Sequence, residues 1–547
     1  MNEEHAETAV SERTRAFVLG LDGVPWNLLE RWASAGELPN FGRLLTEGAA
    51  GPLESTTPAT TALAWPSLAT GVRPDRHGSY GFRRLQPDYT HRMTTSDDIT
   101  ATPLWERLSP AVVANVPMTY PAQPIDGELV SGMMTPRLDE RATHPSSLAE
   151  TVRETVPDYR IGLDWNEYAD RPDDLVSDLE AAVGARRELM RLLMEREDWR
   201  LFFFVYTAPD RLQHLVWDED RILEHYRLLD EILGEVLAYV ERHDATLFVV
   251  SDHGFGPVET IVNVNTALER AGYLTATEPS GARGALARLG IGKASVRDTL
   301  ERLGLDESAV LRRLPTTLVE RVASTVPGDH VLFDVDYGET LAFCYGAGLV
   351  YVNDTERFAE GTVPPEDRTR IRDEVAAVLR SLRDPATGDP VVQVHEGSAL
   401  FPTDERAPDL VVRGAGDYHI GTSLTETVYT APESLNATHR SEGIALVWGP
   451  SIQPGTRLAD ATVYDLAPTL LHTVGEPVPA DTDGRVWTEA FEPGSDPVSR
   501  AVELGPPADA SEEPGSRDDP DADGPEPTDD EEAAAVEDRL RGLGYLD

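Results

Sequence analysis

Residues 246–254 read TLFVVSDHG. A run of strand-forming residues ends abruptly in an acid, an imidazole and a glycine, and glycine lets the backbone turn tightly. Residues 16–23 read AFVLGLDG and have the same form, and the apolar run LFFFVY at 201–206 is followed by Asp210. Such runs alternate along the chain with helical patterns. The sequence therefore predicts an α/β fold with a mainly parallel central sheet flanked by helices.

The remaining regular elements follow from the same kinds of pattern. Further apolar runs predict strands at 111–115, 409–413 and 444–448. Apolar residues at three- and four-residue spacing predict helices at 176–197 and 221–242.

The predicted strands bring acids and imidazoles to a common edge, because functional residues of open parallel sheets gather at the carboxyl ends of the strands. Asp22 follows the strand at 16–21, and Asp252 and His253 follow the strand at 246–251. Asp210 and His214 have i, i+4 spacing, which puts both on one helix face where they can share a metal. An ordinary surface pair on a helix would have the same spacing.

The charge of the chain is strongly negative. Its 547 residues contain 48 basic and 96 acidic side chains, a net charge of −48, and Lys293 is the one lysine. An acidic, lysine-poor surface suits a cytoplasm full of salt, where screening weakens self-repulsion. The composition thus predicts a halophilic protein and argues against nucleic acid or anionic lipid as a partner of the surface as a whole.

The ends and the single cysteine bear on location. The N-terminus lacks the basic start and apolar run of a signal peptide. No segment has the roughly 18–20 apolar residues of a membrane span. We therefore expect a cytoplasmic protein without a transmembrane segment. Cys344 lies in the apolar stretch LAFCY at 341–345, which favours a buried structural thiol.

Composition also divides the chain. We expect a disordered N-terminus at 1–15, a catalytic domain at 16–490, an acidic disordered linker at 491–532 and a short C-terminal helix at 533–547. Arginines interleave with leucines at 275–326, which predicts a helical insertion. It is either an amphipathic helical pair packed on the core or a cap that meets an anionic substrate or a membrane surface.

Seven residues have the chemistry of a two-metal phosphoester site. Thr61 has a hydroxyl that a metal would activate as a nucleophile, although threonine also serves well as a helix N-cap. Three carboxylates, three imidazoles and this hydroxyl form the set: Asp22, Thr61, Asp210, His214, Asp252, His253 and His439. Mixed nitrogen and oxygen ligands without thiolate suit Zn²⁺ or Mn²⁺, and seven ligands fit two metals.

These motifs resemble the alkaline phosphatase superfamily, in particular its type I phosphodiesterase/nucleotide pyrophosphatase branch. The resemblance rests on LGLDG at 19–23, ALAWPSLATGVRPDRHG at 62–78, APD at 208–210, VSDHGFG at 250–256 and THR at 438–440. With the acidic composition it suggests a prokaryotic, haloarchaeal member of that branch. It implies an alkaline-phosphatase-like catalytic domain.

The resemblance also implies roles. Asp22, Thr61, Asp252 and His253 would hold one metal, and Asp210, His214 and His439 the other. Thr61 would be the nucleophile and pass through a phosphothreonine intermediate. Thr60 is the rival nucleophile, and His77 matches the family motif as a structural residue.

One departure from the family bears on the substrate. Nucleotide-handling members carry Phe-Pro-Asn just after the nucleophile, whereas this chain has ALAW at 62–65. The sequence thus predicts a metal-dependent hydrolase of small-molecule or lipid- or glycan-linked phosphoesters, first of diesters. A phosphomonoesterase or phosphotransferase of the same superfamily is the alternative, and a non-catalytic binding module on this fold is another. A sulfatase is disfavoured because the residues around Cys344 do not suit formylglycine formation.

Overall fold

The computed structural model describes residues 14–163, 168, 171–277, 335–432 and 436–507, together with Val536, Glu537 and Leu540. The insertion predicted at 275–326 lies outside the described residues from position 278 onward. So do residues 1–13 of the N-terminal segment and residues 508–532 of the predicted linker. The predicted domain boundaries therefore stay predictions.

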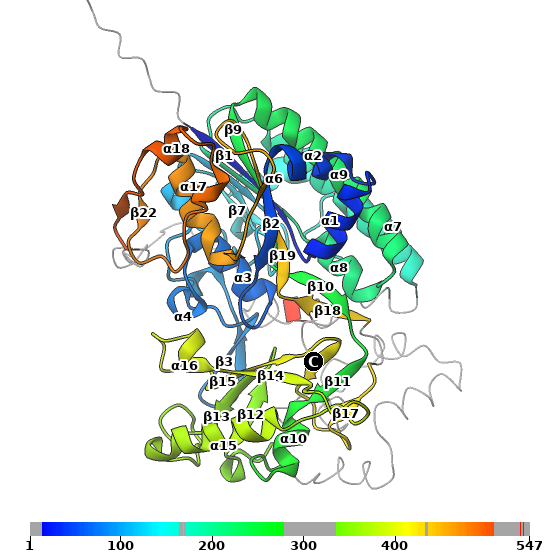
Figure 1. The fold of residues 1–547 in the computed structure, drawn as a ribbon, viewed down its shortest axis with the longest axis vertical. Coiled ribbons are helices and arrows are strands. Elements are labelled where there is room, and N and C mark those ends of the chain that lie inside the picture. Colours follow the sequence, from blue (N-terminus) through cyan, green and yellow to red (C-terminus); the bar gives the residue numbers. More distant parts are fainter. Residues whose placement is uncertain are drawn as a thin grey trace, which may run out of the picture.

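The larger of two lobes is built on a ten-stranded sheet (Figure 1). Its strands, in spatial order, are β20 (Thr456–Arg457), β2 (Ala49–Glu54), β19 (Glu442–Trp448), β9 (Ala245–Val250), β1 (Arg15–Leu21), β8 (Leu201–Tyr206), β5 (Ala111–Ala114), β6 (Gly127–Val130) and β7 (Thr143–His144), with β21 (Ala461–Thr462) beside β2. The five strands from β9 to β6 are parallel, whereas β19 and β7 run antiparallel to their neighbours. The predicted mainly parallel central sheet is confirmed.

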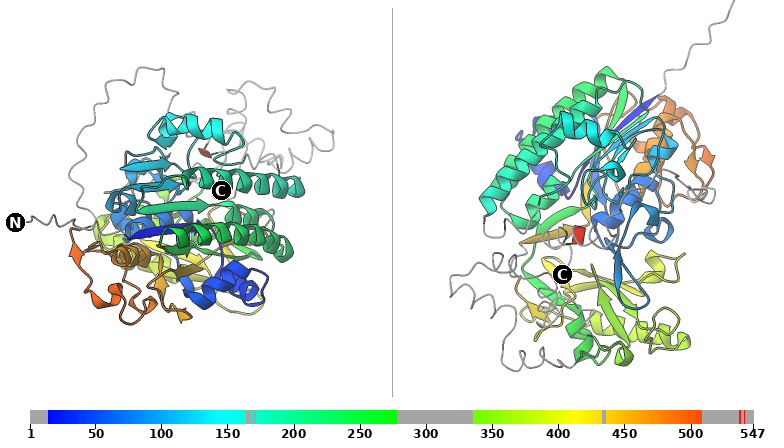
Figure 2. Two further views of the ribbon diagram at one scale, coloured as in Figure 1. Left: turned by 90° about the horizontal axis from the view of Figure 1, so that it is seen from above. Right: turned by 180° about the vertical axis from the view of Figure 1, so that it is seen from behind.

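Helices cover both faces of this sheet (Figures 1 and 2). Side chains alternate along β1: Phe17 and Leu19 enter one core cluster, and Ala16 and Val18 the other. The first cluster is covered by α1 (Trp26–Ser34), α2 (Pro39–Glu47), α6 (Leu148–Thr155), α7 (Pro172–Leu193), α8 (Ala208–Leu215) and α9 (Glu219–Arg242). The second is covered by α3 (Thr61–Thr70), α5 (Leu104–Arg107) and α17 (Leu466–Val474). The helices predicted at 176–197 and 221–242 correspond to α7 and α9.

The smaller lobe has its own antiparallel sheet and its own core. The sheet order is β12 (Ala342–Tyr345), β13 (Leu349–Val352), β15 (Leu410–Gly414) and β14 (Val392–Glu396), and α10 (Val264–Arg270) and α15 (Arg368–Arg380) pack on it. The strand predicted at 409–413 is thus β15, outside the central sheet, because an apolar run does not specify its partners. Cys344 is fully buried in β12.

Shorter elements lie around and between the lobes. Two antiparallel pairs lie near the junction (Figure 1), namely β10 (Gly254–Pro257) with β18 (Ala437–Arg440) and β3 (Arg83–Leu85) with β4 (His91–Met93). A three-stranded sheet contains β16 (Tyr418–Gly421), β11 (Thr260–Asn263) and β17 (Tyr429–Thr430). The others are α4 (Pro74–His77), α16 (Gly397–Leu400), α18 (Asp496–Ser499), β22 (Val478–Pro479) and β23 (Leu504–Gly505).

Three residues near the C-terminus contact the larger lobe and the β3–β4 hairpin. Val536 and Leu540 are buried against the core of the larger lobe that includes α7 and α9. The Glu537 carboxylate lies 3.6 Å from the Arg83 guanidinium and 3.5 Å from the His91 ring, both in the β3–β4 hairpin. Val536, Glu537 and Leu540 therefore pack on the rest of the described protein.

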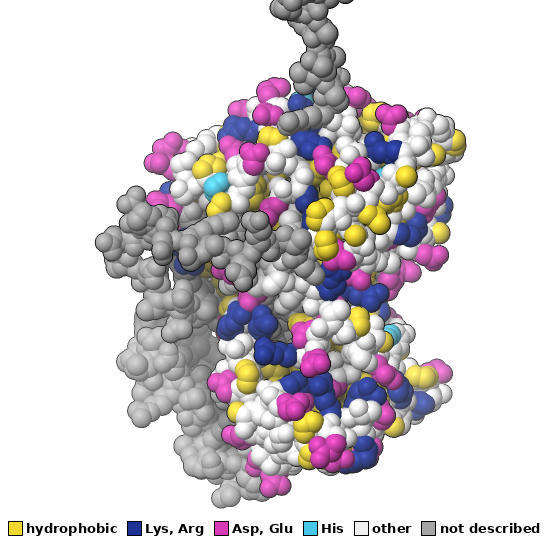
Figure 3. Space-filling view, turned by 90° about the vertical axis from the view of Figure 1, so that its left-hand side faces the viewer, with side chains coloured by type: hydrophobic (Ala, Val, Ile, Leu, Met, Phe, Trp, Pro, Cys, Tyr) yellow, Lys and Arg dark blue, Asp and Glu magenta, His cyan; other side chains and the backbone are white. Residues whose placement is uncertain are grey.

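Acidic and basic side chains are interspersed on the face shown in Figure 3. Because Lys293 falls outside the described residues, every basic side chain on that face is an arginine. In the described part of the chain, each helix is too short or too polar to cross a membrane.

Candidate active site

Three neighbouring strands of the larger lobe deliver acids to one edge of the sheet. Asp22 directly follows β1, and Asp252 lies two residues beyond β9. Asp210 lies in the first turn of α8, just after β8. Gly23, at φ 73°, lies so close to Asp210 that a Cβ there would be 2.9 Å from the Asp210 Cα. Only glycine permits this approach of the two segments.

Asp210 lies among three imidazoles. Its Oδ1 atom is 3.5 Å from His214 Nε2, 3.3 Å from His439 Nε2 and 3.9 Å from His253 Nε2. The Nε2 atoms of His214 and His439 are 3.0 Å apart, and the His253 and His439 rings stack at 3.9 Å. Asp210, His214 and His439 form one group whose ligand atoms all lie within 4.8 Å of one another.

A second group with the same spread contains Asp22, Asp210 and His253. Asp22 Oδ1 is 3.6 Å from His253 Nε2, and Asp252 Oδ2 is 3.3 Å from the same nitrogen. The Thr61 hydroxyl is also 3.3 Å from His253 Nε2. All seven predicted residues thus converge. Asp210 belongs to both groups, whereas the resemblance placed it in one.

Backbone contacts orient two of the imidazoles. The Nδ1 atoms of His253 and His439 lie 3.0 Å and 3.1 Å from the carbonyl oxygens of Gly254 and Ala59. A carbonyl only accepts, so each Nδ1–H donates, and the lone pair of each Nε2 faces the carboxylates. Burial lowers the pKa of His214 to about 3 and also lowers the pKa of His253 and His439. The three rings are therefore neutral, which is the form that binds metals.

The carboxylates repel one another in a buried setting. Burial, followed by the charges of Asp252 and Asp210, raises the pKa of Asp22 well above its ordinary value. Burial and the Asp210 charge raise the pKa of Asp252 to about 7. Asp22 and Asp252 therefore release their protons less readily than ordinary carboxyls do.

Helix α3 places the predicted nucleophile. Thr61 is its first residue and is fully buried, and Thr60 is the N-cap but makes no side-chain cap hydrogen bond. The first backbone N–H groups of α3 therefore have no cap, and a helix N-terminus attracts anions. The Thr60 hydroxyl has no hydrogen-bond partner in the described part of the chain, whereas the Thr61 hydroxyl faces His253.

Two further residues of the motif at 62–78 lie outside the set of candidate ligands. Trp65, in α3, donates its indole N–H to Asp22 Oδ2 at 3.1 Å. Sequence reasoning noted Trp65 only as part of a motif, because nothing in the sequence predicts that its indole reaches Asp22. His77 lies apart from the metal-type groups, with Nε2 3.0 Å from the Ser67 hydroxyl.

A sequence model of the type I phosphodiesterase/nucleotide pyrophosphatase family matches residues 16–444. The chain therefore belongs to this family. Membership indicates an enzyme that hydrolyses phosphoesters. No curated protein matches the chain by sequence similarity.

One solved structure shows the same fold at low identity, and a second is similar to a lesser degree. Human ectonucleotide pyrophosphatase/phosphodiesterase 5 is 13% identical, with a TM-score of 0.50, and the match covers 87% of this chain and 98% of that one. Its murine counterpart is 14% identical, with a TM-score of 0.47, and covers 86% and 98%. At such identity the human structure supports the alkaline-phosphatase-type fold alone.

Proposed function

We propose that the chain hydrolyses phosphodiesters with Thr61 as nucleophile and two divalent metal ions. One observation carries the proposal: seven ligand-type side chains from segments far apart in sequence converge in a buried group with excess acid. In the described part of the chain, neither Asp22 nor Asp252 has an arginine or lysine within ion-pair distance. Buried carboxyls without such a partner hold either a proton, which their raised pKa favours, or a cation from outside the chain.

The residues fit such ions. The unprotonated Nε2 atoms of His253 and His439 face the carboxylates, and Asp22 Oδ1 and Asp252 Oδ2 accept no hydrogen bond from the described residues. We propose that Asp22, Thr61, Asp252 and His253 hold one ion and that Asp210, His214 and His439 hold the other. The donors suit Zn²⁺, with Mn²⁺ as the alternative.

When bound, the metals supply positive charge that lowers the pKa of the Thr61 hydroxyl and stabilises the leaving oxygen. The Thr61 oxygen attacks phosphorus, the bond to the leaving group breaks, and the leaving oxygen takes up a proton. Water then attacks the phosphothreonine, which releases the phosphorylated product and restores the Thr61 hydroxyl. The start of α3 holds the phosphoryl oxygens, and burial keeps bulk water away.

The acidic surface supports a proposal about the setting. With a net charge of −48 and one lysine, we propose that the enzyme works in a salt-rich cytoplasm of a haloarchaeal cell. Its substrate would be a small-molecule or lipid- or glycan-linked phosphoester and not a nucleic acid.

The test of the proposed function compares esters on one metal-loaded protein. We expect release of nitrophenol from bis(p-nitrophenyl) phosphate to exceed release from p-nitrophenyl phosphate and p-nitrophenyl sulfate. Faster turnover of the monoester would make the enzyme a phosphomonoesterase. Stoichiometric metal without turnover of any ester would favour the non-catalytic binding module.

A further inference from the structure

A guanidinium without an acidic partner is buried beside the candidate site. Arg186, on α7, is 4% exposed. It donates to the Thr207 hydroxyl at 2.8 Å and to the Ile161 carbonyl at 2.6 Å, and both acceptors are neutral. In the described part of the chain, its Nε–H has no hydrogen-bond partner and no carboxylate lies within ion-pair distance. Burying an uncompensated charge is costly, so this arrangement calls for an explanation.

A second buried donor lies nearby. Asn115 directly follows β5, is 1% exposed and has a left-handed backbone with φ 61°. Its Oδ1 accepts a hydrogen bond of 2.5 Å from the Tyr159 hydroxyl, whereas its Nδ2 has no partner among the described residues. Burial raises the pKa of Tyr159 to about 12, and the nearby charge of Arg186 acts in the opposite direction. Tyr159 therefore hydrogen-bonds Asn115 and lies within electrostatic range of Arg186.

This pair of donors lies at the same sheet edge as the metal-type groups. β5 pairs with β8, and β8 pairs with β1, which ends next to Asp22. Thr207, the acceptor of the Arg186 hydrogen bond, precedes Asp210 by three residues, which is roughly 4.5 Å along a helix axis. Burial lowers the pKa of Arg186, and Tyr159, Tyr206 and, least of the three, Asp22 act in the opposite direction.

We propose that Arg186 and Asn115, with Tyr159 holding the Asn115 amide, form a substrate subsite for an anionic oxygen group. The inference rests on the proposed function and names its substrate class: a phosphoester with a second anionic group, a carboxylate or another phosphate. The unused groups are all donors, Arg186 Nε–H and Asn115 Nδ2–H₂, and a carboxylate or phosphate only accepts.

The neighbouring residue on α7, Arg187, is an arginine that has acidic partners. Arg187 lies 3.5 Å from the Glu231 carboxylate and donates to Glu235. Arg186 and Arg187 therefore form a matched pair on one helix, one with acidic partners and one without. Arg187 serves as the control for the test.

The test compares two diesters that differ by one carboxylate: phenyl p-nitrophenyl phosphate and 4-carboxyphenyl p-nitrophenyl phosphate. Metal-loaded wild type should show a kcat/KM for the carboxylated diester higher by about tenfold or more, as one or two hydrogen bonds to a charged group provide. Arg186→Met should abolish the preference and Arg186→Lys should keep part of it. Arg187→Met should leave it unchanged.

A second variant covers the case in which Arg186→Met fails to fold. Asn115→Asp keeps the acceptor for Tyr159 and suits the left-handed backbone, but replaces the free amide with a carboxylate. It should reverse the preference. If wild type shows no preference, or if Arg186→Lys and Asn115→Asp leave it unchanged, the subsite is refuted and Arg186 is a structural counter-charge for Asp22.

The two proposals fail separately. Calorimetric titration of metal-loaded Thr61→Ala protein with both diesters measures binding without turnover. Tighter binding of the carboxylated diester in this background, lost on adding Arg186→Met, supports the subsite even if wild type hydrolyses neither ester. Equal binding of the two diesters overturns the subsite even if wild type hydrolyses both.

Discussion

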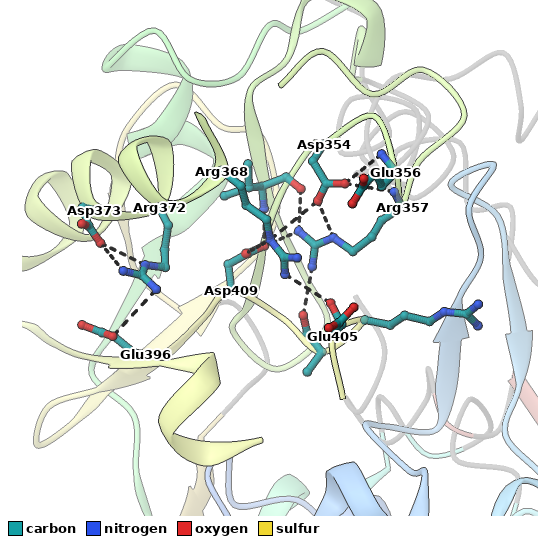
Figure 4. A network of polar contacts seen from close by, with 12 residues as sticks. Asp354, Glu356, Arg357, Arg368, Arg372, Asp373, Glu396, Glu405 and Asp409 are labelled. Carbon is teal, nitrogen blue, oxygen red and sulfur yellow. Dashed lines mark hydrogen bonds and ion pairs between the residues drawn. The ribbon is translucent and has the colours of Figure 1, made fainter. Parts of the chain in front are cut away.

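Each lobe buries a cluster of acids, and the two clusters differ in how their charge is balanced. In the smaller lobe, Asp354 and Asp409 face Arg357 and Arg368 (Figure 4). The Arg368 Nε atom lies 2.6 Å from Asp409 Oδ1, and Arg357 donates to both carboxylates. Two carboxylates meet two guanidiniums, so this cluster is neutral without any added ion.

The cluster in the larger lobe is different. Asp22, Asp210 and Asp252 meet histidines whose pKa burial lowers, so the rings add no positive charge. The comparison teaches that buried acids alone do not mark a site. What distinguishes a candidate metal site is the charge left over after the chain's own partners are counted.

The largest effect that we expect is on turnover. Thr61→Ala should lower kcat on bis(p-nitrophenyl) phosphate by about four orders of magnitude or more, because it removes the nucleophile and a metal ligand. Stopped-flow and end-point assays of nitrophenol release would measure it. Thr60→Ala is the control and should keep most of the activity. Loss in Thr60→Ala with activity kept in Thr61→Ala would move the nucleophile by one residue.

In the smaller lobe the expected effect is on stability. Asp409→Asn leaves the Arg357 guanidinium buried beside one carboxylate fewer, so it should lower the free energy of unfolding by about 3–5 kcal/mol. Urea denaturation would measure the change. Asp373→Asn, in the exposed pair with Arg372, should change it by less than about 1 kcal/mol. Equal effects of the two substitutions would contradict the balanced-cluster interpretation.

The same substitution in the larger lobe should have the opposite sign. Asp22→Asn removes a carboxyl whose ionisation is opposed by burial and by the charges of Asp252 and Asp210, so above the ordinary carboxyl pKa it should stabilise the metal-free protein by about 1 kcal/mol. Urea denaturation of protein from which a chelator has removed all metal would measure this change in stability. The substitution should also lower the affinity of the site for metal. A destabilised metal-free Asp22→Asn protein would mean that the chain balances both clusters itself.

A smaller effect is expected from salt, which acts on the exposed charges of the surface more than on the buried clusters. Lowering KCl from 1 M to 0.1 M lengthens the Debye distance from about 3 Å to about 10 Å, so exposed acids repel more strongly. We expect the Tm to fall by a few degrees in wild type. Asp409→Asn should show the same salt dependence, because its buried network is screened little. A Tm that is unchanged or higher in dilute salt would refute the halophilic interpretation.

Local patterns predicted much of the larger lobe. The strands at 16–21 and 201–206 match β1 and β8 closely, because their runs are long, apolar and end in acid or glycine. The predicted start at 176 lies four residues inside α7, since helix ends carry weaker signals than strand ends. Five of the seven candidate ligands lie just beyond a strand or at a helix start, where sequence patterns point to them, whereas His214 lies near the end of α8 and His439 lies within β18.

Contacts between distant segments were not predictable. Sequence spacing links Asp354 to Arg357, but nothing in the sequence predicts that Asp409 completes the network. The same holds for Arg186, which has the same residue type as Arg187 and differs only in what the fold places around it. Partners of buried charges are set by tertiary packing, and a single sequence does not specify that packing.

Metal stoichiometry tests the central claim most directly. Purified protein loaded with Zn²⁺ or Mn²⁺ and then desalted should contain two ions per chain by elemental analysis. Asp210→Ala with His214→Ala should reduce this to one or none, whereas His91→Ala, outside the site, should leave it at two. A wild-type content of one ion or none, or two ions that persist in the Asp210 and His214 double variant, would contradict the account.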